Sequence, residues 1–198
     1  MKAFKFLAIL GRAGSGKGTQ AELLGQKFPF KHISTGQLLR DRAENKDFLG
    51  KKIADIINAG GLIPTPVTFM LWMPELEALA RQTEYRGLLF DGSPRKLHEA
   101  EMLNDTLELY GWDKDMRVLN IGISEEEALR RLLKRARSDD DEQSIKNRLA
   151  WFTTHVEPTM EYYRKKGLLV DINGEQSVED VQKEILLKLA DFLPNDYS

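Results

Sequence analysis

The stretch FKFLAILGRAGSGKGTQAELL, Phe4 to Leu24, joins an apolar run, a glycine-rich turn and an amphipathic segment without interruption. An apolar run followed by turn residues is typical of a buried strand, and the segment after the turn has helical periodicity. The turn reads Gly11-x-x-Gly14-x-Gly16-Lys17. Such glycines let backbone N–H groups point inward at a helix N-terminus, and the lysine reaches the terminal phosphates of a nucleotide. The stretch predicts a phosphate-binding loop; the alternative, a glycine-rich turn with no ligand, does not explain a lysine in this register.

The hydroxyl that usually follows the lysine of such a loop is displaced by one residue here. Gly18 stands directly after Lys17, and Thr19 comes next. Thr19 is therefore the candidate for a hydroxyl near a metal or a phosphate. The loop predicts a nucleoside triphosphate but does not say what happens to it. A GTPase would need a guanine-reading Asn/Thr-Lys-x-Asp segment, and the sequence has none.

The rest of the chain alternates short apolar runs with longer amphipathic stretches, which is typical of a parallel α/β sheet. The predicted strands are residues 4–10, 30–33, 88–91, 118–123 and 168–172. The predicted helices are residues 17–27, 35–58, 66–82, 96–110, 124–136, 141–166 and 177–193. The helix near 124–136 opens with an N-cap serine and three acids and ends in cations, which matches the helix dipole. The segment from Ser34 to Pro66 is helical between two strands and predicts a small subdomain.

Composition limits the partners. The 198 residues carry 29 basic and 31 acidic side chains and a formal charge of -2, so no overall field draws the chain to nucleic acid or to an anionic membrane. Cysteine is absent and the three histidines are scattered, which excludes thiolate chemistry and disfavours a histidine metal site. The apolar part of residues 1–10 is too short for a membrane span or a signal peptide. We expect a single cytoplasmic domain, residues 1–198, that binds neither nucleic acid nor membrane.

Six arginines stand on or beside the predicted helices: Arg40, Arg95, Arg131, Arg135, Arg137 and Arg148. With Lys17 they make about seven cations, close to the roughly six negative charges of a triphosphate and a monophosphate together. The alternative for each arginine alone is a solvated helix face, but many cations on one side of a protein repel one another without an anion. The number indicates two nucleotides. Asp91, at the carboxyl end of its predicted strand, is suited to hold a metal-bound water beside the phosphates.

Six segments resemble, in order and spacing, the adenylate kinases and the wider nucleoside monophosphate kinases: GRAGSGKGTQAELL, HISTGQLLR, AGGLIP, DGSPRKLHEAEML, LRRLLKRARSDDDEQSIKNRL and EPTMEYYRKKGLLVDINGEQSVEDV. The resemblance covers nearly the whole chain. It implies a doubly wound, five-stranded parallel sheet, a mobile helical domain over the monophosphate at residues 34–65, and a very short lid over ATP at residues 134–140. It also implies ATP and a monophosphate as partners, magnesium entering with ATP, and a monomer.

The resemblance further implies a role for each matching residue. For ATP it implies the loop Gly14, Ser15, Gly16, Lys17, Gly18 and Thr19 with Arg131, Arg135 and Gln176, the last through its main chain. For the acceptor it implies Thr35, Gly36, Arg40, the backbone of Gly61, Leu62 and Ile63, and then Gly92, Arg95, Glu99, Arg137 and Arg148. The catalytic set that it implies is Lys17, Asp91, Arg95, Arg135, Arg137 and Arg148. No side chain is expected to bind the metal directly; its waters are expected near Asp91, and Thr19 is a further candidate.

Glu99 stands where the family has a glutamine that reads adenine. Glutamine can donate to N1 of adenine and accept from its amino group, whereas an ionised glutamate only accepts. An unmatched buried pair costs about 1 to 3 kcal/mol, and guanine, with two donors on that edge, suits a carboxylate better. Two other outcomes remain open: the carboxyl is protonated, or it turns to Lys96 or to solvent and leaves the base to the backbone.

The sequence therefore predicts a nucleoside monophosphate kinase, with the adenylate kinase reaction, ATP and AMP giving two ADP, as the first hypothesis. A kinase that prefers GMP or another monophosphate is the alternative that Glu99 leaves open. A non-catalytic nucleotide-binding module is a further alternative, although a mere binder would not need the arginines that stabilise a transition state. A nucleic-acid-binding ATPase is disfavoured, since the chain has no basic tract with interleaved aromatic residues.

Overall fold

The computed structural model describes residues 4–135 and 141–194 of the chain. Its glycine-rich turn lies between β1 (Lys5–Leu10) and α1 (Lys17–Lys27), as the sequence predicts. Successive side chains of β1 point to opposite faces of the sheet. Phe6 and Ala8 pack on one face, whereas Leu7 and Ile9 pack on the other. Both faces of β1 are therefore buried, and the phosphate-binding turn begins at the end of a strand in the middle of the core.

The strands of the described chain form one parallel sheet. They are β1, β2 (Phe30–Ser34), β3 (Gly87–Asp91), β4 (Asp115–Gly122) and β5 (Leu169–Asn173), in the order β2-β3-β1-β4-β5. The predicted five-stranded parallel sheet is confirmed. β1 and β3 are neighbours, with Ile9 paired to Asp91. The chain leaves β1 toward β2 and leaves β3 toward β4, in opposite directions, so the carboxyl ends of β1 and β3 border the switch point where open α/β sheets bind ligands.

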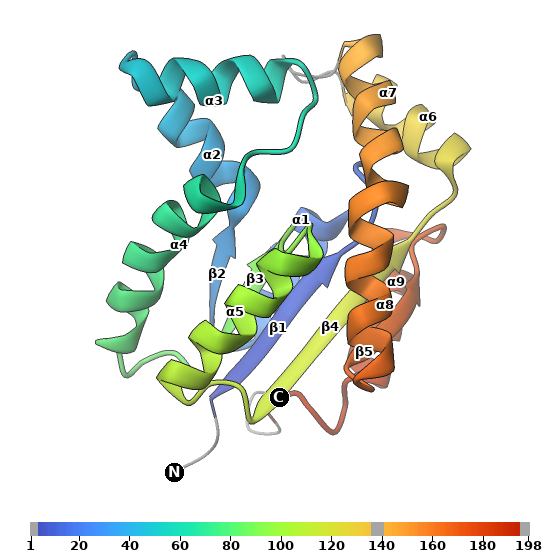
Figure 1. The fold of residues 1–198 in the computed structure, drawn as a ribbon. Coiled ribbons are helices and arrows are strands. Elements are labelled where there is room, and N and C mark those ends of the chain that lie inside the picture. The colour runs from blue at the N-terminus through green and yellow to red at the C-terminus, as the bar shows by residue number, and fades with distance from the viewer. Residues whose placement is uncertain (1–3, 136–140, 195–198) are drawn as a thin grey trace.

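Helices cover both faces of this sheet, which is the doubly wound arrangement that the sequence predicts. α1 and α9 (Val178–Lys188) pack on one face. α4 (Thr65–Ala80), α5 (Leu97–Tyr110) and α8 (Glu157–Lys165) pack on the other, where Trp72, Leu103 and Tyr163 are fully buried. Figure 1 shows α5 and α8 in front of the strands. None of the helices in the described part of the chain is long and apolar enough to cross a membrane.

The helix predicted over residues 35–58 is two helices, α2 (Thr35–Glu44) and α3 (Phe48–Asn58). The break has a local cause, because the carboxylate of Asp47 accepts a hydrogen bond from the backbone N–H of Gly50 and caps a new helix. Leu39, Ile53 and Ile63 form an apolar cluster separate from the main core. In Figure 1, α2 and α3 stand beyond the carboxyl ends of the strands. Both helices lie within the predicted subdomain 34–65; its role and its mobility stay predictions.

The helix predicted over residues 141–166 is also interrupted. α7 (Glu142–Trp151) passes through a π-helical turn (Phe152–Val156) into α8. Such turns insert an extra residue, redirect the side chains around them, and occur often at functional sites. On the other side of the predicted lid, α6 (Glu125–Arg135) extends to the last residue that the structure describes before residue 141. Of the predicted lid, residues 136–140 lie outside the described residues, and with them lies Arg137.

Candidate active site

A cavity of about 760 Å³ lies at the carboxyl ends of the strands. Its wall combines the glycine-rich turn, the β2–α2 junction, the β3–α5 turn, α6 and α7. In Figure 1, α2 and α3 stand on one side of this edge of the sheet, and α6 and α7 stand on the other. Segments that are distant in sequence therefore face one another across the turn that follows β1.

The turn requires glycine for steric reasons. Gly11 has a φ of +141°, and a Cβ at this position would lie 2.4 Å from the carbonyl oxygen of Ile121 on β4. Gly16, the N-cap of α1, is in the left-handed conformation with a φ of 93°, which a side chain disfavours. The chain can thus pass from β1 into α1 without a side chain blocking the N-terminus of the helix. Gly14, Gly16, Gly18 and Thr19 all line the cavity.

Lys17 is the first residue of α1 and also lines the cavity. Its Nζ donates to the carbonyl oxygens of Gly11 at 2.9 Å and Arg12 at 2.8 Å. Burial lowers the pKa of Lys17 to about 8; the charge of Asp91 opposes this shift, and Arg95 and Arg135 reinforce it. The lysine is thus held within the loop in surroundings that disfavour its charge, which an anion would reverse.

Asp91 ends β3 and faces the same cavity. Its Oδ2 accepts a hydrogen bond from the hydroxyl of Ser34 at 3.1 Å and lies 3.9 Å from Nε2 of His32. Burial alone would raise the pKa of this carboxyl, but His32, the charge of Lys17 and the Ser34 hydroxyl together hold it below its usual value. Asp91 is therefore an ionised, oriented oxygen donor beside the phosphate-binding turn. The same Ser34 hydroxyl caps α2, where it accepts a hydrogen bond from the N–H of Gln37.

All the predicted arginines that the structure describes line the cavity: Arg40, Arg95, Arg131, Arg135 and Arg148. Arg40 donates to Oε1 of Gln37 at 2.7 Å. Arg95 donates through Nε to the carbonyl of Gly92 at 2.6 Å, and its guanidinium carbon lies 5.6 Å from the centre of the Trp151 ring. Burial lowers the pKa of Arg95; Glu99 and Asp91 oppose this, and Arg148 and Arg40 reinforce it. The cavity therefore concentrates positive charge from separate elements.

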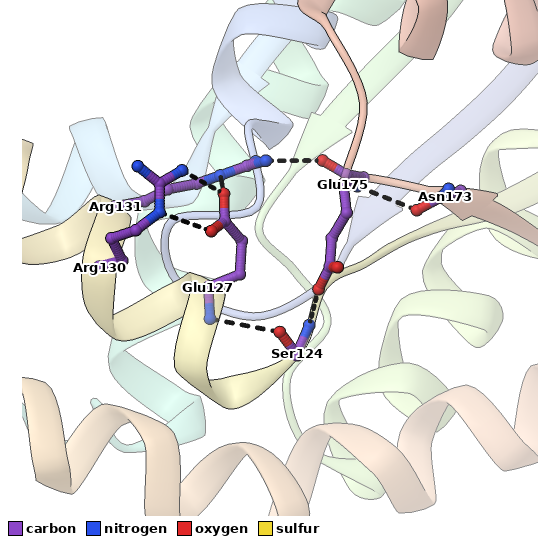
Figure 2. Close-up of polar contacts among 7 residues, drawn as sticks. Ser124, Glu127, Arg130, Arg131, Asn173 and Glu175 are labelled. Carbon is purple, nitrogen blue, oxygen red and sulfur yellow. Dashed lines mark hydrogen bonds and ion pairs between the residues drawn. The ribbon is translucent and has the colours of Figure 1, made fainter.

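Arg131 is fixed by the network in Figure 2. Its Nε donates to Glu127 at 2.6 Å and its NH2 donates to the carbonyl of Gly174 at 2.9 Å. Hydrogen bonds from Arg130 and Arg131 lower the pKa of Glu127 to about 2. Glu175 accepts from the N–H of Ser124 at 2.6 Å. These contacts tie the start of α6 to the β5–α9 loop, so Arg131 is held in place by partners within the protein.

Some predicted site residues are not in the cavity wall: Ser15, Thr35, Leu62, Glu99 and Gln176. Thr35 is buried and accepts a hydrogen bond from Nε1 of Trp72 at 3.0 Å. Gln176 donates through Nε2 to the carbonyl of Asn173 at 2.9 Å and to Glu184 at 2.6 Å. Both side chains are used within the fold, so a role for either in binding remains a prediction.

The wall also contains residues that sequence reasoning missed, chiefly His32, Glu75 and Trp151. His32 is the third residue of β2, and its neighbour Asp91 is 59 residues away in sequence. Trp151 is the last residue of α7, and its partners come from α3 and the β3–α5 turn. Only long-range contacts distinguish these side chains from ordinary strand and helix residues, and no local pattern reports such contacts.

A phosphate-binding turn on a parallel sheet of order 2-3-1-4-5, facing arginines from several elements, defines a P-loop nucleotide kinase. A family model described as "Adenylate kinase" matches residues 9–168. Curated adenylate kinases are similar: that of Azobacteroides pseudotrichonymphae is 38% identical, covering 92% of this chain and 96% of its own, and that of Corynebacterium urealyticum is 37% identical, covering 92% and 98%. The adenylate kinase of Caldicellulosiruptor bescii is 33% identical over 92% and 98%. The chain belongs to the adenylate kinase family.

Replacing Lys17 by methionine tests whether the site holds a buried cation. Folding lowers the pKa of Lys17 from 10.5 to about 8, so above pH 8 the unfolded chain binds this proton more tightly and the wild type gains stability as pH rises toward 10. The variant lacks this gain. We expect the wild type to gain about 1 to 2 kcal/mol of unfolding free energy over Lys17→Met between pH 7 and pH 9.5, measured by urea unfolding. Lys51→Met, on an exposed turn of α3, controls for loss of a lysine, and a pH-independent difference would contradict the burial.

Proposed function

We propose that this member of the adenylate kinase family transfers the γ-phosphoryl group of ATP to AMP, giving two ADP. The observation that carries the proposal is the cavity in which Lys17 and five arginines from four segments face the phosphate-binding turn. Phosphoryl transfer needs in-line positioning, neutralisation of charge on the equatorial oxygens and exclusion of water rather than covalent help. A cavity lined by these cations supports the proposal, because they would neutralise the charge on the phosphate oxygens.

The placement of the cations supports a division of labour. Lys17 and the turn from Gly14 to Thr19 would hold the ATP phosphates, with Arg131 and Arg135 from α6 beside them. Arg40 from α2 and Arg95 from the β3–α5 turn would hold the acceptor phosphate. Arg148 from α7 would meet the group in transfer, and Arg137, outside the described residues, is proposed for the same role. The donor phosphates and the acceptor phosphate would thus enter from opposite walls.

Magnesium is the cofactor that the family implies, and the residues present fit it. The Asp91 carboxylate is ionised, lines the cavity and is oriented by Ser34, and oxygen donors of this kind suit the water shell of Mg²⁺. The Thr19 hydroxyl also belongs to a residue of the wall. Bound with ATP, magnesium would neutralise charge on the phosphate oxygens. The part of this chain would be to orient its waters through Asp91.

Glu99 is held in a way that bears on the acceptor base. Its side chain is 2% exposed. Oε2 accepts from the backbone N–H of Arg95 at 2.8 Å, and Oε1 accepts from the hydroxyl of Thr65 at 3.3 Å. The hydroxyl of Thr68 lies 3.5 Å from Oε1 and donates more closely to the carbonyl of Thr65, at 2.8 Å. Both oxygens of the carboxylate are therefore in contact with donors of the fold. We propose that Glu99 holds the first turn of α5 and the backbone of Arg95, and that the backbone of residues 61–63 contacts the base.

The remaining features of the proposal rest on the resemblance and on charge. A formal charge of -2 supports an enzyme that attracts neither nucleic acid nor an anionic membrane. We propose that it works as a monomer in the cytoplasm. Residues 34–65 are proposed to close over AMP, and residues 134–140 are proposed as the short lid over ATP.

An assay of ATP with AMP, GMP, CMP and UMP, following ADP formation, tests the activity. We expect AMP to be the best acceptor, and we expect Arg95→Ala to lower kcat/KM by about a hundredfold or more, because one charge-assisted contact to the transferred group is lost. Lys165→Ala, on the exposed end of α8, is the control for loss of a cation. No turnover with any acceptor would refute the kinase, and best turnover with GMP would refute the adenylate assignment.

A substitution at Glu99 tests the proposed structural role. Glu99→Gln keeps an acceptor for the N–H of Arg95, so we expect AMP turnover to change less than about threefold. Glu99→Ala leaves that N–H unpaired and should cost about 1 to 3 kcal/mol of unfolding free energy, measured by denaturant unfolding. A rise of tenfold or more in kcat/KM for AMP in Glu99→Gln would show instead that the carboxylate reads the base.

A further inference from the structure

The C-terminal end of α3 has an unusual neighbour. α3 ends in a Schellman turn: the N–H of Gly61 donates to the carbonyl of Ile56 at 2.8 Å, and the N–H of Gly60 donates to Ile57 at 2.9 Å, with a φ of +66° at Gly60. In such a turn the carbonyls that follow the last helical residue have no partner within the helix. The carbonyls of Ala59 and Gly60 occupy these positions.

Side chains of α7 supply the partners. Asn147 donates through Nδ2 to the carbonyl of Ala59 at 2.8 Å, and Trp151 donates through Nε1 to the carbonyl of Gly60 at 2.8 Å. The two residues are four apart, so they share one face of α7. The two elements are more than 80 residues apart in the chain, so this is a contact between the predicted acceptor subdomain and the helix that follows the predicted lid.

The backbones fit as closely as the side chains. A Cβ on Gly60 would lie 2.2 Å from the carbonyl oxygen of Ser144, one turn before Asn147 on α7. No side chain can be accommodated there without separating the two helices. Ser144, Asn147 and Trp151 thus form a stripe along α7, which we name the α7 clasp, and the α3 turn is seated on it.

Trp151 connects this contact to the cavity. It lines the cavity, and its ring lies 5.6 Å from the guanidinium carbon of Arg95, within the range of a cation–π contact. The indole N–H holds the α3 turn while the ring flanks the arginine proposed to bind the acceptor phosphate. The same side chain therefore contacts both the α3 turn and Arg95.

We propose that Trp151 is a positioning residue, which couples seating of the α3 turn on the α7 clasp to placement of Arg95 for the acceptor phosphate. The contact can open as well as close, because water can replace the side-chain donors on these carbonyls, at a small net cost, once the two helices separate. Closing aligns Arg95 against the ring, and opening releases both. This inference rests on the proposed function, because it concerns the binding of the acceptor.

The sharpest test compares two glycine substitutions. Gly60→Ala puts a methyl group against the Ser144 backbone, whereas Gly111→Ala, after α5, has a φ of +67° and no atom within 4 Å of the added Cβ. Both variants bear the same backbone strain, and only one blocks the clasp. We expect Gly60→Ala to raise KM for AMP at least about tenfold and Gly111→Ala to leave it within about twofold, both measured at a temperature at which each variant is folded. Equal KM values in the two variants would overturn the inference.

A second test separates the N–H of Trp151 from its ring. Trp151→Phe removes the donor and keeps an aromatic face, and Trp151→Leu removes both. We expect KM for AMP to rise about fivefold in Trp151→Phe and more than that in Trp151→Leu, with KM for ATP unchanged in both. Trp112→Phe, in the aromatic stack with Phe4 and Tyr110, is the matched control. A larger effect on KM for ATP would contradict a role at the acceptor.

Fluorescence gives a readout that needs no turnover. Trp72 donates to Thr35 and can also respond to AMP, so the size of the emission change is the readout. If Trp151 reports closure, the change on addition of AMP should be as large in Trp112→Phe as in the wild type and clearly smaller in Trp151→Phe. A change of the same size in all three proteins would overturn the coupling. The two failures can be told apart. If the proposed function is wrong, the wild type does not convert AMP at all. If only this inference is wrong, the wild type converts AMP, and KM for AMP is the same in Gly60→Ala as in Gly111→Ala.

Discussion

The fold holds several cations around one cavity before any anion has entered it, and this constraint shapes the rest of the structure. Like charges a few ångströms apart repel strongly where water is partly excluded. At Lys17 the main effect is burial, which lowers the pKa to about 8, and the charges of Arg95 and Arg135 act in the same direction. Groups of opposite polarity offset part of this repulsion. In the parallel sheet Ile9 pairs with Asp91, so the Asp91 carboxylate lies at the end of β3, next to the turn that carries Lys17. The carbonyls of Gly11 and Arg12 accept hydrogen bonds from the Lys17 ammonium group.

The arginines are held by partners of different strength. Arg40 donates to a neutral amide at Gln37 and Arg95 to the carbonyl of Gly92, so phosphate oxygens would be stronger acceptors than the present ones. Arg131 instead donates to the ionised Glu127 and is anchored in a network (Figure 2). A weakly held arginine can turn toward a ligand, whereas an anchored arginine keeps its place in the cavity wall. Arg40 and Arg95, on the side proposed to hold the acceptor, are therefore held more weakly than Arg131 on α6.

The sequence predicts those parts of the structure that local chemistry determines. The turn between β1 and α1 depends on glycines and a lysine within a few residues, and the strands depend on short apolar runs, so both were predictable. The break at Asp47 was missed because helical patterns lie on both sides of it, although the aspartate is itself a cap signal. The contacts of Trp151 and Glu99 could not be predicted. Glu99 meets Thr65 across 34 residues, and a resemblance could say that its position is unusual but not what holds it.

Arg95 shows how these separate contacts act on one side chain. Its backbone N–H is held by Glu99 from α5, whose other oxygen binds hydroxyls at the start of α4. Its guanidinium is held by Gly92 and lies against Trp151 from α7, which in turn holds the α3 turn. Contacts from separate elements therefore meet at Arg95: Glu99 holds its backbone N–H, and Gly92 and Trp151 contact its guanidinium. A change in the position of the α3 turn would reach the guanidinium through Trp151, whereas the contact with Glu99 would keep the backbone N–H in place.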